Sequence, residues 1–422
     1  REGTDMIACG LDFGTSNSAI GVLKGNAPAL APVEGESTLI PSAVFFEDQD
    51  RYRVRFGAEA ISTYIEQADG RLFRALKTIL GSPLIEETTA LGRRKIALAD
   101  VVQMFVRHLK LAAEAFLGQE VSAVVHGRPV RFVDGDDAAD AKAEKTLRDI
   151  AQRVGFREVT FVYEPLAAAL HYEQSAVREE LVLVADIGGG TSDFTVIRIG
   201  PGRPARADRK DDILAFTGVR VGGTDFDSEI SLDAVMPLLG RGSPLIEKGM
   251  TMPHALYREL ATWATINFTY SYRNRREVTQ LMREAQEPEK IARLLKVLHD
   301  RLGHRIAFAA EEAKIALSEA DGFELALAFI EAGLGAQATR AGFDRAIRRG
   351  VERIGRAAAD CVAAAGLQQG DIETIFFTGG SSRVPAVRAA ISRAAPDARA
   401  MTGNDLLSVA WGLTQEATRR FA

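Results

Sequence analysis

The chain has 422 residues, of which 46 % are hydrophobic and 26 % are charged, and its formal net charge at pH 7 is −5. This length suffices for two or three domains with large cores, and the composition is that of an ordinary globular protein. A mildly acidic chain has no overall positive field to attract nucleic acid or an anionic membrane, so we expect neither as a partner.

Three features predict a cytoplasmic protein. No uninterrupted apolar run approaches the ~20 residues that a membrane span needs. The first residues, REGTDMIACG, lack the charged-then-apolar pattern of a signal peptide. Cys9 and Cys361 have neither metal-ligand nor redox spacing, and we interpret both as buried thiols in a reducing compartment.

The first half of the chain alternates predicted strands and helices. Apolar or alternating segments predict strands at 7–13, 18–23, 43–46, 53–56, 121–127 and 157–164, and helical spacing covers 98–116 and 136–154. EPLAAALHYE (164–173) then opens a helix with Pro165 at its first position, where the missing N–H costs nothing. Glu164, directly before the proline, is expected to be extended and able to point into a cleft.

The strand pattern restarts at Leu181, so we expect mixed, partly parallel sheets covered by helices. Residues 201–212 are a polar hairpin loop without recognisable chemistry. Residues 244–306 form a long, charge-rich helical block, which we interpret as an inserted subdomain with a solvated face rather than a nucleic-acid site.

Two glycine-rich turns repeat one pattern. GLDFGTSNSAIGV (10–22) and VADIGGGTSDFTVI (184–197) each consist of a strand, an aspartate, a glycine turn, hydroxyl residues and a second strand. Aligning Asp12 with Asp186 also aligns Gly14 with Gly188. A tight hairpin turn needs only one or two glycines, which adopt the positive φ angles of the turn. The additional glycines suggest that a ligand approaches the backbone here. The separation is far too long for a solenoid and indicates a duplicated domain.

Consecutive N–H groups in a glycine turn make a nest for phosphate oxygens, and hydroxyls from Thr15, Ser16 and Thr191 can add contacts. A carboxylate beside a polyphosphate is repelled unless a cation lies between them. Asp12 and Asp186 therefore indicate hydrated Mg²⁺, which takes one or two carboxylates plus substrate phosphates. The P-loop and dinucleotide-binding fingerprints are absent.

GLDFGTSNS and ADIGGGTSDF resemble the two phosphate loops of the actin-like ATPase superfamily, in particular the DnaK-type heat-shock protein 70 chaperones. Further motifs resemble this family in the right order: LKTILG (76–81), VYEPLAAAL (162–170), VGGTDFD (221–227), AEEAKIALS (310–318) and FFTGGSSRVPAV (376–387). GRPVRF and LMREAQEPEK look most like the YegD-like branch, a nucleotide-binding domain that stands alone.

The resemblance implies ATP or ADP with Mg²⁺ as the bound ligands, and K⁺ as an additional cation near Asp12 and Asp193. The implied catalytic residues are Lys77, Glu164, Thr191 and Asp193, and the implied metal ligands are Asp12 and Asp186. The implied nucleotide-binding residues are Gly14, Thr15, Ser16, Asn17, Gly188, Gly189, Gly190, Gly222, Gly223, Glu311, Lys314, Ile315, Ser318, Gly379, Gly380, Ser381 and Arg383. Independently of the family, Glu311, Lys314 and Ser318 share one helical face.

This chain departs from the family pattern at several positions. Asn17 stands where the chaperones have an aromatic residue, and Ile315 stands in place of the arginine that stacks on adenine. Leu406 replaces a late aspartate. These departures predict intact phosphate and magnesium chemistry with a weaker grip on the base, and hence weaker ATP binding with less preference over GTP.

We therefore expect an α/β fold of two ribonuclease-H-like lobes facing each other across a cleft. Lobe I is predicted at 1–178, with the helix at 402–422 packed back on it. Lobe II is predicted at 179–401 and includes the insertion at about 244–306. ATP would bind at the cleft floor, and water would attack its γ-phosphate in a slow, Mg²⁺-dependent hydrolysis.

Three alternatives remain: a nucleotide sensor that does not hydrolyse ATP, a small-molecule kinase and a filament-forming actin relative. A kinase would need a second substrate pocket, which the sequence does not reveal. We expect a monomer whose protein partner contacts the helical insertion. Because no linker or peptide-binding domain follows the last helix, we also expect no ATP-dependent binding of unfolded peptide.

Overall fold

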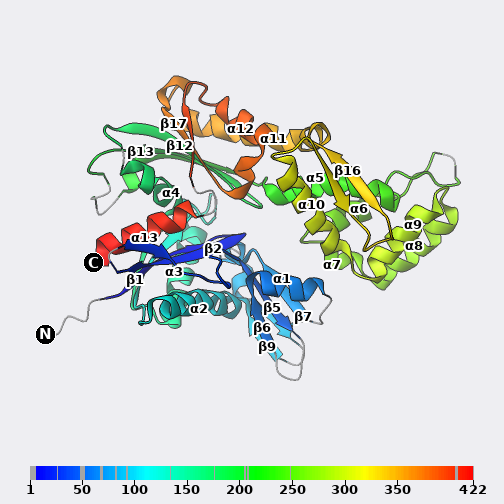
Figure 1. The fold of residues 1–422 in the computed structure, drawn as a ribbon, viewed down its shortest axis with the longest axis horizontal. Helices are drawn as coiled ribbons and strands as arrows, with labels where there is room; N and C mark the ends of the chain where they lie inside the picture. Colours follow the sequence, from blue (N-terminus) through cyan, green and yellow to red (C-terminus); the bar gives the residue numbers. More distant parts are fainter. Residues whose placement is uncertain are drawn as a thin grey trace.

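The computed structural model describes residues 6–25, 27–47, 53–66, 70–80, 83–91, 94–133, 135–174, 176–203, 206, 209–247, 249–403 and 407–421. Two mixed sheets dominate it, one in each half of the chain (Figure 1). We call the region around the first sheet lobe I and the region around the second lobe II; their boundaries along the chain stay a prediction.

The two sheets have the same strand order. The first runs β11 (Glu158–Tyr163), β10 (Ala123–Arg128), β1 (Ala8–Phe13), β2 (Asn17–Lys24) and β3 (Ala27–Leu30), with β4 (Ile40–Pro41) beside β2. The second runs β18 (Arg399–Thr402), β17 (Thr374–Thr378), β12 (Glu180–Ile187), β13 (Ser192–Ile199) and β14 (Ile213–Val219). In each sheet the central strand pairs parallel on one side and antiparallel on the other. The predicted duplication is therefore confirmed.

In lobe I, α2 (Leu98–Leu117) and α3 (Asp137–Val154) bury apolar side chains such as Phe105 and Leu147 against one face of the sheet. α4 (Glu164–Glu173) and α13 (Ser408–Phe421) pack on the other face through Ala167 and Leu413. Leu166 of α4 belongs to a cluster with strands of the second sheet, so α4 and α13 lie between the two sheets (Figure 1).

A small arm extends from lobe I. Its three-stranded sheet runs β6 (Arg53–Phe56), β5 (Ala43–Glu47) and β7 (Gly70–Arg74), with α1 (Gly57–Ile65) packed on β5. A hairpin of β8 (Thr88–Leu91) and β9 (Arg94–Ala97) and the 3₁₀ turns η1 (Leu76–Ile79) and η2 (Pro83–Glu86) follow.

In lobe II, α11 (Arg340–Ala364) packs on β13 and β14 of the sheet. α12 (Pro385–Ser392) and α5 (Gly223–Ile230) pack against α11, and α10 (Gly303–Leu317) packs against α5, so that all four helices share one core with the sheet. Its helical insertion comprises α6 (His254–Ala261), α7 (Ile266–Thr269), α8 (Tyr272–Glu284) and α9 (Pro288–His299). The remaining elements are β15 (Gly322–Ala326), β16 (Gly335–Thr339) and the short turns η3 (Lys210–Asp212), η4 (Ser231–Val235), η5 (Met236–Leu239), η6 (Gln369–Asp371) and η7 (Gly380–Arg383).

Two expectations hold and one needs correction. Cys9 in β1 and Cys361 in α11 are both fully buried free thiols, as predicted. Among the described helices, none is both long enough and apolar enough to cross a bilayer. The prediction of an extended Glu164 is wrong, because Glu164 is already the first residue of α4 and Pro165 is the second. The extended residue lies one position earlier, at Tyr163, which caps the helix.

Candidate functional site

The two glycine turns form the tips of two hairpins, β1–β2 and β12–β13. At the second tip, the Gly188 N–H donates to the Thr191 carbonyl at 2.9 Å. At the first tip, a Cβ added to Gly14 would lie 2.1 Å from the Asn17 carbonyl oxygen. A side chain at position 14 would force that turn open, so the glycine is required by local geometry.

The glycine turns meet each other. A Cβ on Gly189 would lie 2.4 Å from the Ser16 hydroxyl of the other hairpin. The third glycine loop joins them, because Gly223 N–H donates to the Gly188 carbonyl at 3.0 Å and Thr224 N–H to the Gly189 carbonyl at 2.7 Å. Turns that lie far apart in the sequence thus converge on one region between the lobes, as the sequence predicted.

An ion pair crosses the floor of this region. Lys77, on η1 of the arm, donates from Nζ to Oε1 of Glu164 at 2.5 Å, and both side chains are largely buried. Burial by itself would lower the pKa of Lys77, but the charges of Glu164 and Asp12 hold it above its ordinary value. Lys77 therefore carries its positive charge inside the site.

Asp12 and Asp186 lie in the same electrostatic cluster. Burial and the neighbouring Glu164 raise the pKa of Asp12 to about 8. Burial, then Asp193 and Glu164, raise the pKa of Asp186 to about 7. Asp186 and Asp193 are opposite each other in the β12–β13 ladder, and Thr191 donates its hydroxyl hydrogen to Asp193 at 2.9 Å.

This chemistry suits a hydrated divalent cation. Buried carboxylates with raised pKa values are stabilised in their charged form when a cation lies next to them. Among the described residues, no three His, Cys, Asp or Glu side chains converge closely enough to hold a metal by themselves. A pair of aspartates is still the donor set that Mg²⁺ uses when phosphates and waters supply its other ligands.

The other end of the site is built on α10. Lys314 Nζ lies 2.9 Å from Oδ1 of Asp227, donates to its Oδ2 at 3.0 Å and also contacts the Gly223 carbonyl at 3.4 Å. Asp227 Oδ1 is buried but has no well-aligned hydrogen-bond donor. Burial raises the pKa of Asp227 to about 7, against the lowering effect of Lys314. A carboxylate oxygen that is ion-paired with Lys314 but receives no well-aligned hydrogen bond can still accept one from a ligand hydroxyl.

Two further loops reach this end. A Cβ on Gly223 would lie 2.3 Å from the Ser381 hydroxyl, so η7 packs directly on the start of α5. Gly379 has φ +79°, and a Cβ there would lie 2.6 Å from Oδ1 of Asp186. Gly379 is thus required both by its backbone conformation and by its approach to the carboxylate.

Other expected residues lie on the same turns and helices, but the structure does not test their roles. They are Thr15, Asn17, Gly190, Gly222, Glu311, Ile315, Ser318, Gly380 and Arg383. Ile315 is 62 % exposed. Leu406 lies outside the described residues.

Two residues of the site were missed from the sequence. Asp227 stands four residues after Gly223 in α5, so helical spacing alone could have placed its carboxylate near the glycine loop. The second missed residue is Arg74. Its guanidinium lies close enough to Glu311 and Asp227 for their negative charges to oppose the lowering of its pKa by burial. Arg74 gave no such signal, because it reaches lobe II from the arm of lobe I.

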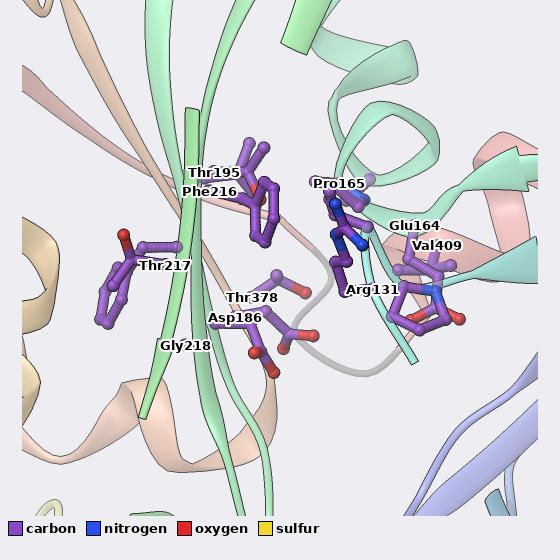
Figure 2. A pocket seen from close by; sticks show the side chains of 16 residues that line it. Arg131, Glu164, Pro165, Asp186, Thr195, Phe216, Thr217, Gly218, Thr378 and Val409 are labelled. Atoms are coloured by element: carbon purple, nitrogen blue, oxygen red, sulfur yellow. The ribbon is translucent and has the colours of Figure 1, made fainter. Parts of the chain in front are cut away.

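A cavity of about 60 Å³ adjoins the carboxylates (Figure 2). Glu164 and Pro165 border it from α4, and Asp186 and Thr378 border it from the second sheet. Arg131 also lines this space, beside Phe216 of β14.

A family model described as Hsp70 protein matches residues 81–236 and 278–414, which together make up most of the chain. The chain belongs to the Hsp70 family. This confirms the resemblance to heat-shock protein 70, and with it a nucleotide-binding, ATPase-type protein of actin-like fold. The matched part of this Hsp70 begins after Lys77 and leaves out residues 237–277, in the helical insertion. The site roles of Asp12 and Lys77 therefore stay predictions, which rest on their sequence motifs and on the geometry of the site.

Proposed function

We propose that this Hsp70-family chain is a Mg²⁺-dependent ATPase that hydrolyses ATP slowly. The observation that carries the proposal is the buried Lys77–Glu164 ion pair, which lies beside Asp12 and Asp186. A lysine and a glutamate held together at the meeting point of phosphate-binding turns are suited to positioning a water molecule against a phosphoryl group.

The nucleotide would lie along the cleft floor. Its phosphates would accept hydrogen bonds from the N–H groups of the glycine turns and from the Thr191 hydroxyl. Its adenosine would lie against α10 and η7, where Glu311, Lys314, Ser318 and the segment 379–383 are expected to contact it. The Asp227 carboxylate, which pairs with Lys314 at this end of the site, supports the placement, because it can also accept a hydrogen bond from a ribose hydroxyl.

Hydrolysis would be in-line attack by water. Glu164 would accept a hydrogen bond from the attacking water and so orient its lone pair. The Lys77 ammonium would place positive charge next to the developing negative charge. When bound, Mg²⁺ supplies charge neutralisation at the phosphate oxygens, and Asp12 and Asp186 would hold it. In this mechanism the protein positions the water and stabilises charge but forms no covalent bond with the phosphate. We expect the turnover to be slow.

A phosphate-release assay under single-turnover conditions tests the proposal. We expect release from ATP with Mg²⁺, none with EDTA, and a rate at least about tenfold lower for Glu164→Gln, which removes the charge that pairs with Lys77. Retained Mg·ATP binding without any release would instead establish a nucleotide sensor. Failure to bind ATP at all would refute the proposal.

A further inference from the structure

The arm of lobe I contacts the helical insertion of lobe II. Tyr64 at the end of α1 donates its hydroxyl hydrogen to Oδ1 of Asn267 in α7 at 2.6 Å. Its ring meets His304 of α10 edge-on, at 4.9 Å between centroids. Arg74, the last residue of β7, lies over the Trp263 ring with its Cζ 4.2 Å from the centroid. In Figure 1, α1 accordingly faces α7 across the gap between the lobes.

A bend in the backbone at Ala75 directs the side chains of Arg74 and Lys77 to different parts of the site. Ala75 has the left-handed conformation φ 54°, ψ 39°, which non-glycine residues adopt rarely and chiefly at functional sites. On one side of this bend, Lys77 contacts Glu164 at the phosphate end. On the other side, Arg74 lies close enough to Glu311 and Asp227 for their charges to act on it. One short segment of lobe I thus serves both ends of the site.

The Arg74 guanidinium lacks polar partners. It is partly buried, and burial lowers its pKa while Glu311 and Asp227 act in the opposite direction. Within the described part of the chain, it makes no hydrogen bond or ion pair, and it lies over the Trp263 ring. A guanidinium has five N–H donors in a rigid plane, and the contact with the Trp263 ring leaves these donors unused.

On lobe II, the adenosine end of the site carries isoleucine at position 315, where the family resemblance leads us to expect an arginine. Ile315, on the face of α10 next to Lys314, presents an exposed alkyl side chain. Lys314 itself is occupied by Asp227. Besides Arg383 of η7, which is expected at the adenosine end, Arg74 is a second arginine close to this end, and it comes from lobe I.

We propose that Arg74 is a further nucleotide-binding residue, a cation that lobe I supplies to the adenosine end of the site and that Trp263 holds in place by stacking. This inference rests on the proposed nucleotide site. Since Glu311 and Lys314 belong to lobe II, a nucleotide contacted by Arg74 connects the two lobes through its adenosine as well as through its phosphates.

Calorimetric titration with Mg·ADP tests the role of Arg74. Arg74→Met keeps an unbranched stem for packing on Trp263 but removes every donor. We expect ADP to bind at least about fivefold more weakly to this variant, in line with the loss of a stacked, charge-assisted contact. Arg74→Lys keeps the charge without the planar fork, and its affinity should fall between the two; it also provides the test if Arg74→Met does not fold.

Two control variants separate ligand contact from simple bridging of the lobes. Arg71→Met removes an exposed arginine that lies over Phe73 on the same strand, and it should leave ADP affinity within about twofold. Tyr64→Phe breaks the hydrogen bond to Asn267 and should also have an effect of less than about twofold.

Wild-type affinity in Arg74→Met, or an equal loss in Tyr64→Phe, would overturn this inference while leaving the proposed function intact. Wild-type protein that binds no ADP would overturn both.

Discussion

At the scale of single residues, Lys77 is the most informative position. It would be read as an ordinary surface lysine from its local sequence, and only the family resemblance singled it out. The structure places its ammonium 2.5 Å from Glu164 and among buried carboxylates. Its burial is decided by the arm folding over lobe I, a long-range event that no local pattern records.

We predict that Lys77→Ala slows single-turnover phosphate release at least about tenfold but leaves ADP affinity within a few-fold, because loss of a transition-state contact lowers turnover without equal loss of binding. Lys145→Ala is the matched control, since the Lys145 side chain is 76 % exposed and pairs only with Asp149. Full activity in Lys77→Ala would exclude the proposed mechanism.

The buried side chain of His126 leads to a prediction about how the stability of the fold depends on pH. It is fully buried in β10 and packs near Phe13 and Phe161, and its Nε2 has no hydrogen-bond partner among the residues that the structure describes. Burial lowers the pKa of His126 to about 4. The folded state therefore holds the ring neutral where the unfolded chain, with a pKa near 6.5, already binds a proton. Its contribution to stability is present above pH 6.5 and is lost as the pH falls towards 4.

We predict that His126→Phe reduces the loss of unfolding free energy between pH 6.5 and 4.5, measured by urea unfolding at several pH values. The substitution is expected to change the slope of unfolding free energy against pH, rather than the unfolding free energy at neutral pH. His254→Phe, at an exposed position at the start of α6, should keep the wild-type slope. An unchanged slope in His126→Phe would show that this ring does not control acid unfolding.

At the scale of elements, α13 and α4 pack unusually closely. A Cβ on Gly412 would lie 1.9 Å from the Ala167 carbonyl oxygen, and a Cβ on Gly10 would lie 2.2 Å from the Thr414 nitrogen. Backbone atoms cannot move aside as a flexible side chain can. These two glycines therefore set how deeply the last helix can pack between α4 and the first sheet.

We predict that Gly412→Ala destabilises the protein by about 1–3 kcal/mol, the usual range for overpacking, which lowers the Tm of a chain of this length by about 1–3 °C. Gly370→Ala is the control, because nothing lies within 4 Å of a Cβ at that position and its φ is not positive. Equal melting temperatures for the two variants would contradict the packing described for α13.

The sequence predicted elements well where a local pattern dominates. The strands at β1, β2 and β10 and the helices α2, α3 and α4 lie within a few residues of their predicted positions. β7 was missed, since GRLFR is short and carries two arginines. Its strand conformation depends on pairing with β5, from which it is separated by α1. Such pairing is a tertiary property.

At the scale of the whole molecule, the repeated aspartate–glycine–hydroxyl pattern was sufficient to predict a duplicated fold. The identical strand orders of the two sheets confirm it. The composition of the site was predictable only where the repeat or a family motif reached. Arg74 and Asp227 lie close enough for their charges to interact, and neither belongs to the repeat.

We predict that ADP raises the melting temperature only when Mg²⁺ is present. At a ligand concentration 100-fold above the Kd, linkage stabilises the folded protein by about 2.7 kcal/mol, which corresponds to several degrees. Differential scanning fluorimetry with ADP, Mg·ADP and MgCl₂ alone provides the comparison. An equal shift with ADP in EDTA would show that Asp12 and Asp186 do not depend on a cation when nucleotide binds.

The two cysteines provide separate reporters of how each lobe opens. Cys9 lies in the core of lobe I and Cys361 in that of lobe II, and both thiols are fully buried. Burial raises the pKa of Cys361 to about 11 and raises that of Cys9 further. Because only an accessible thiolate reacts, a thiol reagent labels each site at the rate of local unfolding there. Labelling kinetics of Cys9→Ala and Cys361→Ala would therefore show whether nucleotide stabilises both lobes together or one before the other.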